Sequence, residues 1–516
     1  MLTAIFVKKT TKLLSGIKKL AGQTMWYGVS SIAARFISYL LTPYLTRTSV
    51  LQVSDYGKMS LVYAAFPLLN VLFIYGFETA YFRFAQRKEY QNSLYSTASI
   101  SLFISTIILS AFLWIFHDAL AGFAGIAGEP QLIKLSIIII ALDALTAIPF
   151  AKLRLEGRPV KYAIIRICSI LLYTSATVFF LSYCPKIITH NPDSWIGIFY
   201  RIDINPVTYV LVANLMASGL TLLLLMGQIG SVKLHFNTKL WKEMMIYSLP
   251  LIIVGLGGMI NETFDRLMLN WWVPGSITFK EEQVGIYSAC YKLSLLISLF
   301  IQAFRMGAEP FFFKQAEGLN PQRTYARVMK FFVITVTLMF LLVSLYLPVI
   351  SYFFLGNKTY LAGLGVVPIL LLANIFLGIY YNLSIWYKLG NKTKAGAWIT
   401  ITGTAITIII NRLFIPDFGY MACAWATFFC YGSMMVISFL WGQKEYRIPY
   451  ATKKLAAYIA IVVILFFIHK GLTLLLPNIW FSLVIASLLL LIYTWFILLT
   501  EKKEFQKLPL IGKYIK

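Results

Sequence analysis

The sequence predicts an all-α protein that crosses a membrane about fourteen times, with two parallel six-helix lobes and two additional C-terminal helices. Composition, a regular series of apolar runs and an internal repeat predict this fold class. Of the 516 residues, 59% are hydrophobic and 13% are charged, and the mean hydropathy is +0.76. A soluble domain has about 25% charged residues. This composition therefore indicates a polytopic membrane protein.

The formal net charge of +25 would suggest a nucleic-acid partner if the protein were soluble. Here the basic residues occur in short clusters between apolar runs, which is the pattern of membrane topology. We therefore expect no nucleic-acid partner. The five cysteines lie within or at the ends of apolar runs and form no CxxC pair, so we expect neither a disulfide framework nor a metal site.

A membrane-spanning helix needs about 20 mainly apolar residues. The sequence contains fourteen such runs, at residues 22–46, 58–80, 93–116, 132–151, 161–184, 207–229, 244–271, 284–310, 327–355, 360–387, 396–415, 418–441, 452–475 and 479–499.

The distribution of Lys and Arg predicts that both termini are cytoplasmic. When residues at the span ends are counted with the adjoining loops, inside segments hold 31 of the 45 Lys and Arg residues and outside segments hold 9. The loops are too short for a soluble domain. This argues against a membrane glycosyltransferase or polysaccharide polymerase, so we do not expect an enzyme.

The two ends of the chain are basic. Residues 1–21 contain five lysines and no convincing signal-peptidase site, so we expect the first span to stay in the membrane. This segment fits an amphipathic interfacial helix and a disordered basic tail about equally well. Residues 501–516 are expected to form a basic cytoplasmic tail.

An internal repeat predicts the two lobes. With an offset of 231 residues, the segment that begins at Arg35 aligns without gaps on the segment that begins at Arg266. The further identical pairs are Pro43 and Pro274, Val53 and Val284, Tyr56 and Tyr287, Leu68 and Leu299, Gly76 and Gly307, Glu78 and Glu309, and Phe82 and Phe313. Most of these residue types are not expected to match by chance in so apolar a chain.

The repeat places an N-terminal lobe at 22–230 and a C-terminal lobe at 238–442, with the last two spans at 451–500 outside it. The first and seventh spans run in the same direction, so the halves are parallel repeats. Two such bundles enclose a central cavity, and rocking of one against the other exposes the cavity to alternate sides of the membrane.

Four basic residues within the spans are candidates for binding a pyrophosphate: Arg35, Arg266, Lys292 and Arg305. Charges at membrane depth are costly unless they face a cavity or a partner. Guanidinium groups bind phosphate bidentately and stay charged. The alternatives are that Arg266 pairs with Glu262 on the same helix face and that Arg35 reaches the interface or a carbonyl group.

Three acids within the spans, Asp143, Glu262 and Asp265, are candidates for lining the cavity or for coupling transport to an ion. For Asp143 a satisfied polar contact near Thr146 is the simpler interpretation. We expect no cofactor, and coupling to H⁺, Na⁺ or the membrane potential.

Two equivalent acid and base pairs lie at inner helix ends. They are Glu78 with Arg83 and Glu309 with Lys314. Pairing across the lobes would make them a cytoplasmic gate. Local capping and ordinary topology charges explain them equally well.

The sequence resembles a known family in two regions. The first region comprises GVSSIAARFISYLLTPYLTR from Gly28, then Asp55-Tyr56-Gly57, then GFETAYFRF from Gly76. The second comprises DRLML from Asp265, GIYSACYKL from Gly285 and AEPFFFK from Ala308. These segments resemble Wzx-type flippases, the polysaccharide transporter branch of the multidrug/oligosaccharidyl-lipid/polysaccharide (MOP) exporter superfamily.

The resemblance implies a MATE-like fold and the flipping of undecaprenyl-pyrophosphate-linked oligosaccharide to the outer leaflet, for O-antigen, capsule or exopolysaccharide. It implies membrane lipids, a polysaccharide polymerase and assembly proteins as partners. The alternatives are a multidrug antiporter, disfavoured because bases outnumber acids in the spans, a lipid II flippase, and a membrane enzyme, disfavoured by the short loops.

Overall fold

The computed structural model describes residue 33 and residues 36–316, 320–390 and 392–506. In these ranges the regular secondary structure is helical, without β-strands. Thirteen helices there are long and apolar enough to cross a membrane, and in order they match the second to fourteenth predicted spans. The predicted fold class is confirmed. The first predicted span lies largely outside the described residues.

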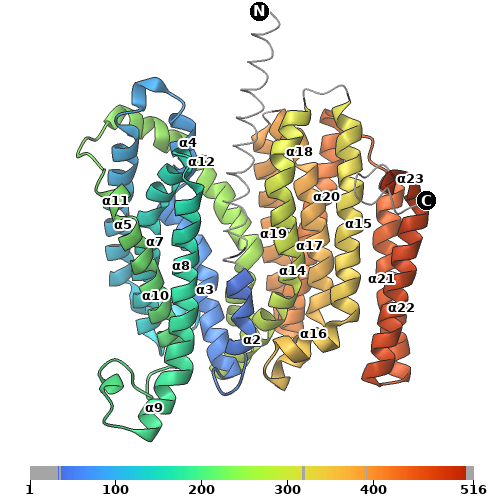
Figure 1. Ribbon diagram of the computed structural model, residues 1–516, viewed down its shortest axis with the longest axis horizontal. Helices are drawn as coiled ribbons and strands as arrows, with labels where there is room; N and C mark the ends of the chain where they lie inside the picture. Colours follow the sequence, from blue (N-terminus) through green and yellow to red (C-terminus); the bar gives the residue numbers. More distant parts are fainter. Residues whose placement is uncertain (1–32, 34–35, 317–319, 391, 507–516) are drawn as a thin grey trace, which may run out of the picture. The chain divides into compact units, whose positions relative to one another are not determined.

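The chain forms two compact units (Figure 1). Unit 1 comprises the described residues up to Ser288 together with Ile415–Gly419. Its helices are α2 (Thr42–Leu45), α3 (Val53–Ile74), α4 (Phe77–Phe84), η1 (Lys88–Tyr90), α5 (Leu94–Ile115), α6 (His117–Ala124), α7 (Pro130–Leu155), α8 (Pro159–Val178), η2 (Phe179–Tyr183), α9 (Cys184–His190), η3 (Trp195–Ile198), α10 (Pro206–Leu224), α11 (Met226–Ile229), α12 (Thr238–Thr263), α13 (Asp265–Trp272) and the first part of α14 (Ile277–Gln315).

Unit 2 comprises Ala289–Phe414 and the described residues from Tyr420 onward. It contains the rest of α14, α15 (Pro321–Leu345), α16 (Leu347–Phe354), η4 (Lys358–Gly363), α17 (Val366–Leu383), α18 (Ile385–Leu389), most of α19 (Thr393–Phe418), α20 (Tyr420–Glu445), α21 (Thr452–Leu475), α22 (Ile479–Thr500) and α23 (Lys502–Phe505).

Proline and asparagine mark the starts of several long helices. Proline begins α7, α8, α10 and α15, where its missing N–H costs no helical hydrogen bond. Asn237 caps α12 by accepting a hydrogen bond from the Leu240 N–H at 3.0 Å, and Asn478 caps α22 in the same way through Trp480 at 2.8 Å. The local sequence therefore sets these helix boundaries.

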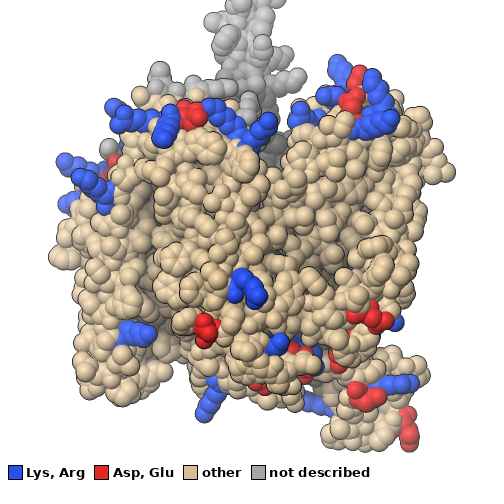
Figure 2. Space-filling model, turned by 180° about the vertical axis from the view of Figure 1, so that it is seen from behind, with Lys and Arg blue, Asp and Glu red and all other residues tan. Residues whose placement is uncertain are grey.

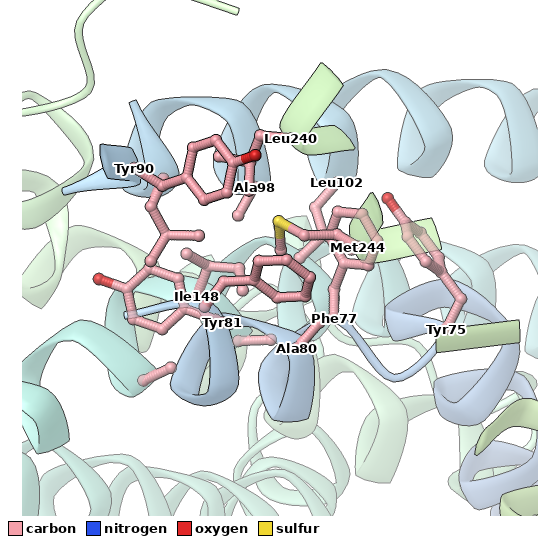
Figure 3. Close-up of a cluster of buried hydrophobic side chains, with 14 residues drawn as sticks. Tyr75, Phe77, Ala80, Tyr81, Tyr90, Ala98, Leu102, Ile148, Leu240 and Met244 are labelled. Atoms are coloured by element: carbon pink, nitrogen blue, oxygen red, sulfur yellow. The ribbon is translucent and has the colours of Figure 1, made fainter. Parts of the chain in front are cut away.

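A pair of left-handed residues ends α3 and starts α4. Tyr75 has φ 37° and Gly76 has φ 74°, and the chain bends there within the predicted second span. The short helix α4 then packs its aromatic residues against α5, α7 and α12. Figure 3 shows this cluster, in which Phe77, Tyr81 and Met244 are buried.

Charged side chains lie mostly toward the helix ends. In the space-filling view a broad uncharged band separates them (Figure 2). This distribution is expected of helices whose middle sections lie in hydrocarbon, where an unpaired charge costs several kcal/mol.

Two glycines allow α3 and the start of α14 to pack backbone to backbone. A Cβ on Gly57 would overlap the main-chain oxygen of Glu281, and one on Gly285 would overlap the main-chain oxygen of Val53. Small residues are used in this way where membrane helices approach closely. This contact joins the equivalent helices of the two sequence repeats within unit 1.

The hairpin of α21 and α22 packs on α15 in unit 2. At one end the buried carboxylate of Glu501, 3% exposed, accepts hydrogen bonds from Lys330 Nζ at 2.6 Å, Tyr458 OH at 2.7 Å and Lys454 Nζ at 3.2 Å. Further along, Tyr493 and Thr337 share a hydrogen bond of 2.8 Å. Burial alone would raise the pKa of Glu501, but its three donors lower it below the ordinary value of 4.5.

We expect Gly57→Ala to destabilise the protein by about 1–3 kcal/mol, because the helix pair must move apart. Gly219 lies within α10 with no heavy atom within 4 Å of the site of an added Cβ. Gly219→Ala is therefore the matched control and should be neutral or stabilising by about 0.5–1 kcal/mol. Thermal unfolding in detergent measures both. Equal shifts for the two variants would contradict the close approach.

We expect Glu501→Gln to cost about 1.5–3 kcal/mol at neutral pH, because the hydrogen bonds that it weakens involve charged groups. The lowered pKa means that the stabilisation is present above pH 4.5 and is lost as the pH falls through the folded-state value. The difference in unfolding temperature between wild type and variant should therefore shrink below pH 4.5. Asp193→Asn, on an exposed loop, is the control. A pH-independent difference would argue against the charged network.

Candidate functional site

The break between α12 and α13 brings two of the predicted site residues together. Asp265 begins α13 directly after Phe264, and its Oδ1 accepts a hydrogen bond from Arg266 Nη1 at 2.9 Å. Both side chains are largely buried, at 3% and 11% exposed. The two groups form a charge pair that makes it less costly to keep the guanidinium inside unit 1.

The same guanidinium also contacts the end of α12. Its Nη1 donates to the main-chain carbonyl of Glu262 at 3.1 Å. A helix end leaves such carbonyls without intrahelical donors, so Arg266 acts as a cap. The residue that pairs with the guanidinium through its side chain is Asp265, while Glu262 contributes its main-chain carbonyl and is itself exposed.

Tyr287 completes this cluster from the first part of α14. Its hydroxyl donates to Asp265 Oδ2 at 2.5 Å, and the Arg266 guanidinium carbon lies 5.7 Å from the centre of its ring. Tyr287 is fully buried, and so is its repeat equivalent Tyr56. Tyr287 is one of the identical residues of the sequence repeat. Its hydrogen bond to Asp265 cannot be predicted from the sequence, because it depends on how α13 and α14 pack.

Asp143 lies on α7 and pairs with α10. Its Oδ1 accepts a hydrogen bond from Ser218 Oγ at 2.8 Å, and its main-chain carbonyl accepts one from Thr146 at 2.7 Å. Thr146 thus bonds the main chain of Asp143, and the polar contact of the carboxylate itself comes from Ser218. The carboxylate itself is held by a neutral donor.

A layer of hydroxyl and amide groups crosses unit 1 between α3, α8 and α10. Asn214 Nδ2 donates to Tyr63 OH at 3.2 Å, and Tyr63 OH lies 3.4 Å from Tyr173 OH. Polar groups are rarely placed in a membrane bundle without a structural or functional reason. Tyr63, Tyr173 and Asn214 carry no charge, so membrane depth alone does not make them stand out in the sequence.

The two predicted basic residues of α14 beyond Tyr287 belong to unit 2. Lys292 is half-buried, and Arg305 is exposed, with its guanidinium carbon 4.5 Å from the centre of the Tyr381 ring. Tyr381 and Asn382 of α17 line a small pocket with Arg305, in which Asn382 is 5% exposed. Arg305 is thus presented beside an aromatic face and an amide.

A large apolar pocket lies in unit 2 between the α21–α22 hairpin and helices α15, α16, α17 and α20. Its volume is about 1030 Å³. Most of its lining is aliphatic or aromatic, and its polar lining includes His469, Lys470 and Asn478, near the turn of the hairpin. The hairpin lies outside the sequence repeat, and no motif in it predicts a pocket.

The predicted gate residues of unit 1 have partners within that unit. Glu78 forms an ion pair with Arg154 at the end of α7, and the Arg83 guanidinium lies over the Tyr247 ring at 4.3 Å. The sequence by itself does not indicate Arg154 as the partner of Glu78. Long-range pairing of this kind leaves no local pattern.

Some predicted site residues fall outside what the structure describes. Arg35 lies outside the described residues, as do the side chains of Glu309 and Lys314. Within the described part of the chain, no group of three or more His, Cys, Asp or Glu side chains is arranged to hold a metal ion.

A polar cluster at the opposite end of unit 1 from Glu78 was also missed. Lys58 lies 3.6 Å from Asp55 and 3.8 Å from Glu281, which is 4% exposed. Asn205 Nδ2 donates to Asp55 at 3.3 Å and to Glu129 at 3.1 Å. The cluster joins α3, α7, α10 and α14 where Gly57 and Gly285 make their close contact. These residues lie at span ends, where sequence gives no reason to expect burial.

Comparison with known proteins gives a family match and several fold matches. The family model described as "Polysaccharide biosynthesis protein" matches residues 20–315, more than half of the chain. No curated protein matches the sequence. The family match confirms the family that the motifs from Gly28 and Asp265 predict.

The fold matches solved structures of MOP transporters. The lipid II flippase MurJ in an inward closed conformation has a TM-score of 0.66 at 16% identity, covering 93% of this chain and 99% of that one. An inward-facing multidrug resistance MATE transporter of the MOP superfamily has a TM-score of 0.61 at 14% identity, over 81% and 94%. A MATE transporter from Vibrio cholerae has a TM-score of 0.54 at 13% identity, over 85% and 99%. At these identities the likeness shows the fold.

We expect charge reversal to identify the partner of Glu78. Glu78→Arg should lower the unfolding temperature, and adding Arg154→Glu should restore it, with a coupling of about 0.5–1 kcal/mol for a partly exposed pair. Adding Arg83→Glu instead is the matched control and should restore nothing. Rescue by the Arg83 change alone would contradict the observed pairing.

Proposed function

Because the chain belongs to the polysaccharide biosynthesis protein family, we propose that it flips undecaprenyl-pyrophosphate-linked oligosaccharide repeat units from the cytoplasmic to the outer leaflet by alternating access. The product would supply assembly of a surface polysaccharide such as O-antigen, capsule or exopolysaccharide. The family match over residues 20–315 carries the proposal, and the MOP transporter fold supports it.

The pyrophosphate is assigned to the basic residues of the spans. Arg266 is held in place by Asp265 and by the end of α12, which reduces the entropy lost when it binds an anion. Lys292 and Arg305 follow on α14, and Arg35 is the repeat equivalent of Arg266. The ring of Tyr381 beside Arg305 offers a flat surface for a sugar.

The polyprenyl chain is assigned to the large pocket of unit 2. Its apolar lining and its volume of about 1030 Å³ suit several isoprene units. Lys470 and His469, which line the hairpin end of the pocket, would meet a charged lipid group there. Such an apolar lining would offer few hydrogen-bond partners to a soluble sugar or a small hydrophilic substrate.

Asp143 is proposed as the group that couples transport to H⁺ or another cation. It is the carboxylate of α7 and rests on a neutral serine hydroxyl. Glu262 and Asp265 are proposed as further acids of the cavity, and Glu78, Arg83, Glu309 and Lys314 as groups of a cytoplasmic gate. The protein would act in the bacterial inner membrane with both termini cytoplasmic, alongside a polymerase and assembly proteins.

A lipid II flippase is the second candidate function. The MurJ fold match, which covers 93% of this chain, favours it. Both functions move a lipid pyrophosphate, so the same basic residues serve either proposal. The phenotype of a deletion strain separates the two.

The test is to delete the gene in its own host and to extract the polyprenyl-pyrophosphate glycans. We expect complete repeat units to accumulate while surface polysaccharide is lost. Loss of viability with accumulation of lipid II would favour the second candidate. Unchanged surface polysaccharide with sensitivity to cationic compounds would contradict both and indicate a multidrug antiporter.

Complementation then tests the basic residues. A charged hydrogen bond is worth about 1.5–3 kcal/mol, so Arg266→Ala should lower flipping at least about tenfold at normal expression. Arg266→Lys should restore part of it, and the Arg35 variants should behave alike. Arg158→Ala, in an exposed surface pair with Glu156, is the control. Full activity of the Arg35→Ala and Arg266→Ala double variant would overturn the assignment.

A further inference from the structure

The segment between α9 and α10 exposes a patch of large apolar side chains. Trp195, Ile198, Phe199 and Ile202 are 67%, 86%, 42% and 57% exposed. Trp195 and Ile198 lie at the two ends of the short 3-10 helix η3, and Phe199 and Ile202 follow in the loop that leads to α10. We call these four residues the 195–202 face.

The segment is held in a fixed conformation. Ile196 and Tyr200 point the other way and are 2% and 6% exposed. Tyr200 stacks on Tyr209 with 4.4 Å between ring centres. Tyr209 OH accepts a hydrogen bond from the Arg201 N–H at 2.6 Å and donates one to the Arg201 carbonyl at 3.0 Å. An exposed apolar surface on so well anchored a loop indicates a binding surface.

The face lies near the end of a membrane span. Helix continues from Pro159 to His190 through the π-helical stretch η2, a length of 32 residues. At about 1.5 Å per residue it is longer than the hydrocarbon thickness of about 30 Å. Figure 1 shows α9 extending past its neighbours in unit 1. The chain then returns, and the contact of Tyr200 with Tyr209 places it level with the first turn of α10.

A run of aromatic rings connects the lipid-facing side of α8 to the face. Phe179 stacks on Tyr183 at 6.1 Å and contacts Phe180 at 5.5 Å. Phe180 contacts Phe199 at 6.3 Å, and Phe199 contacts Trp195 at 5.5 Å. Aromatic packing through the buried ring of Phe180 therefore ties the loop to the end of the span.

The exposed residues of α8 and η2 identify that surface as lipid-facing. Leu171, Val178, Phe179 and Tyr183 are 53%, 40%, 37% and 62% exposed and share one side of a transmembrane span. Exposed Lys186 lies on α9 just before the loop, and the loop itself carries exposed Arg201 together with exposed Asp193 and Asp203. Trp and Tyr with nearby basic residues are characteristic of the boundary between hydrocarbon and head groups.

We propose that the 195–202 face is a membrane-interface anchor. Its four apolar side chains enter the boundary between acyl chains and head groups of the leaflet at this end of unit 1, and Lys186 and Arg201 contact lipid phosphates. The anchor fixes the depth of the extended α8–α9 helix. The partner is the lipid surface and not a second protein.

Depth-sensitive spin labelling tests this in full-length protein reconstituted into phosphatidylethanolamine and phosphatidylglycerol vesicles. Ile198→Cys and Ile202→Cys carry a nitroxide in turn, and Asp193→Cys on the same loop is the matched control. Four of the five native cysteines are buried and one is half-buried, so labelled wild type gives the background. Power saturation compares collisions with O₂, which enters lipid, and with a water-soluble nickel complex.

We expect labels at 198 and 202 to collide more with O₂ than with nickel, and the label at 193 to show the reverse ratio. Nickel accessibility at 198 and 202 equal to that at 193 would overturn the proposal and leave the face open to a soluble protein. Protection from both reagents would also overturn it, because it would mean that protein covers the face. Circular dichroism and size-exclusion profiles that match wild type confirm that the variants fold.

Discussion

The absence of water from hydrocarbon is the constraint on which the rest of this structure depends. Every backbone N–H and C=O group within the membrane must be satisfied inside the protein, and the described spans do this as helices. Where a helix is interrupted, a side chain takes over. At the end of α12 the guanidinium of Arg266 caps a main-chain carbonyl, and Asp265 balances its charge. Arg266, a candidate for ligand binding, thus also satisfies a main-chain carbonyl at a helix end.

The same constraint explains what the sequence could predict. Hydropathy and charge bias located thirteen described helices in order, because apolar length and loop charge are local properties. The family followed from motifs at the starts of the two repeats. The side-chain partners of the charged residues could not be predicted from the sequence. Glu78 pairs with Arg154, and Asp143 pairs with Ser218. The members of each pair are far apart in the sequence, so helical periodicity cannot predict the contact. Tyr287 and the 195–202 face likewise needed the fold, since only packing shows which side chains it leaves exposed.

The two parts of α14 have different surroundings. In unit 1 the start of α14 lies against α3 through Gly57 and Gly285, with Lys58 and Glu281 beside them. In unit 2 the rest of α14 presents Arg305 beside Tyr381. One helix therefore contributes a tight backbone contact in its first part and a cationic surface in its second.

The Glu501 network has a consequence for how the chain is made. Lys330 on α15 is 14% exposed, and its close partner Glu501 lies at the end of α22, 171 residues later. During synthesis α15 enters the membrane long before Glu501 exists. The partner of this ammonium group is therefore available only after α22 has been made. Docking of the last hairpin completes the pairing of Lys330 and makes the end of the chain part of the packing of unit 2.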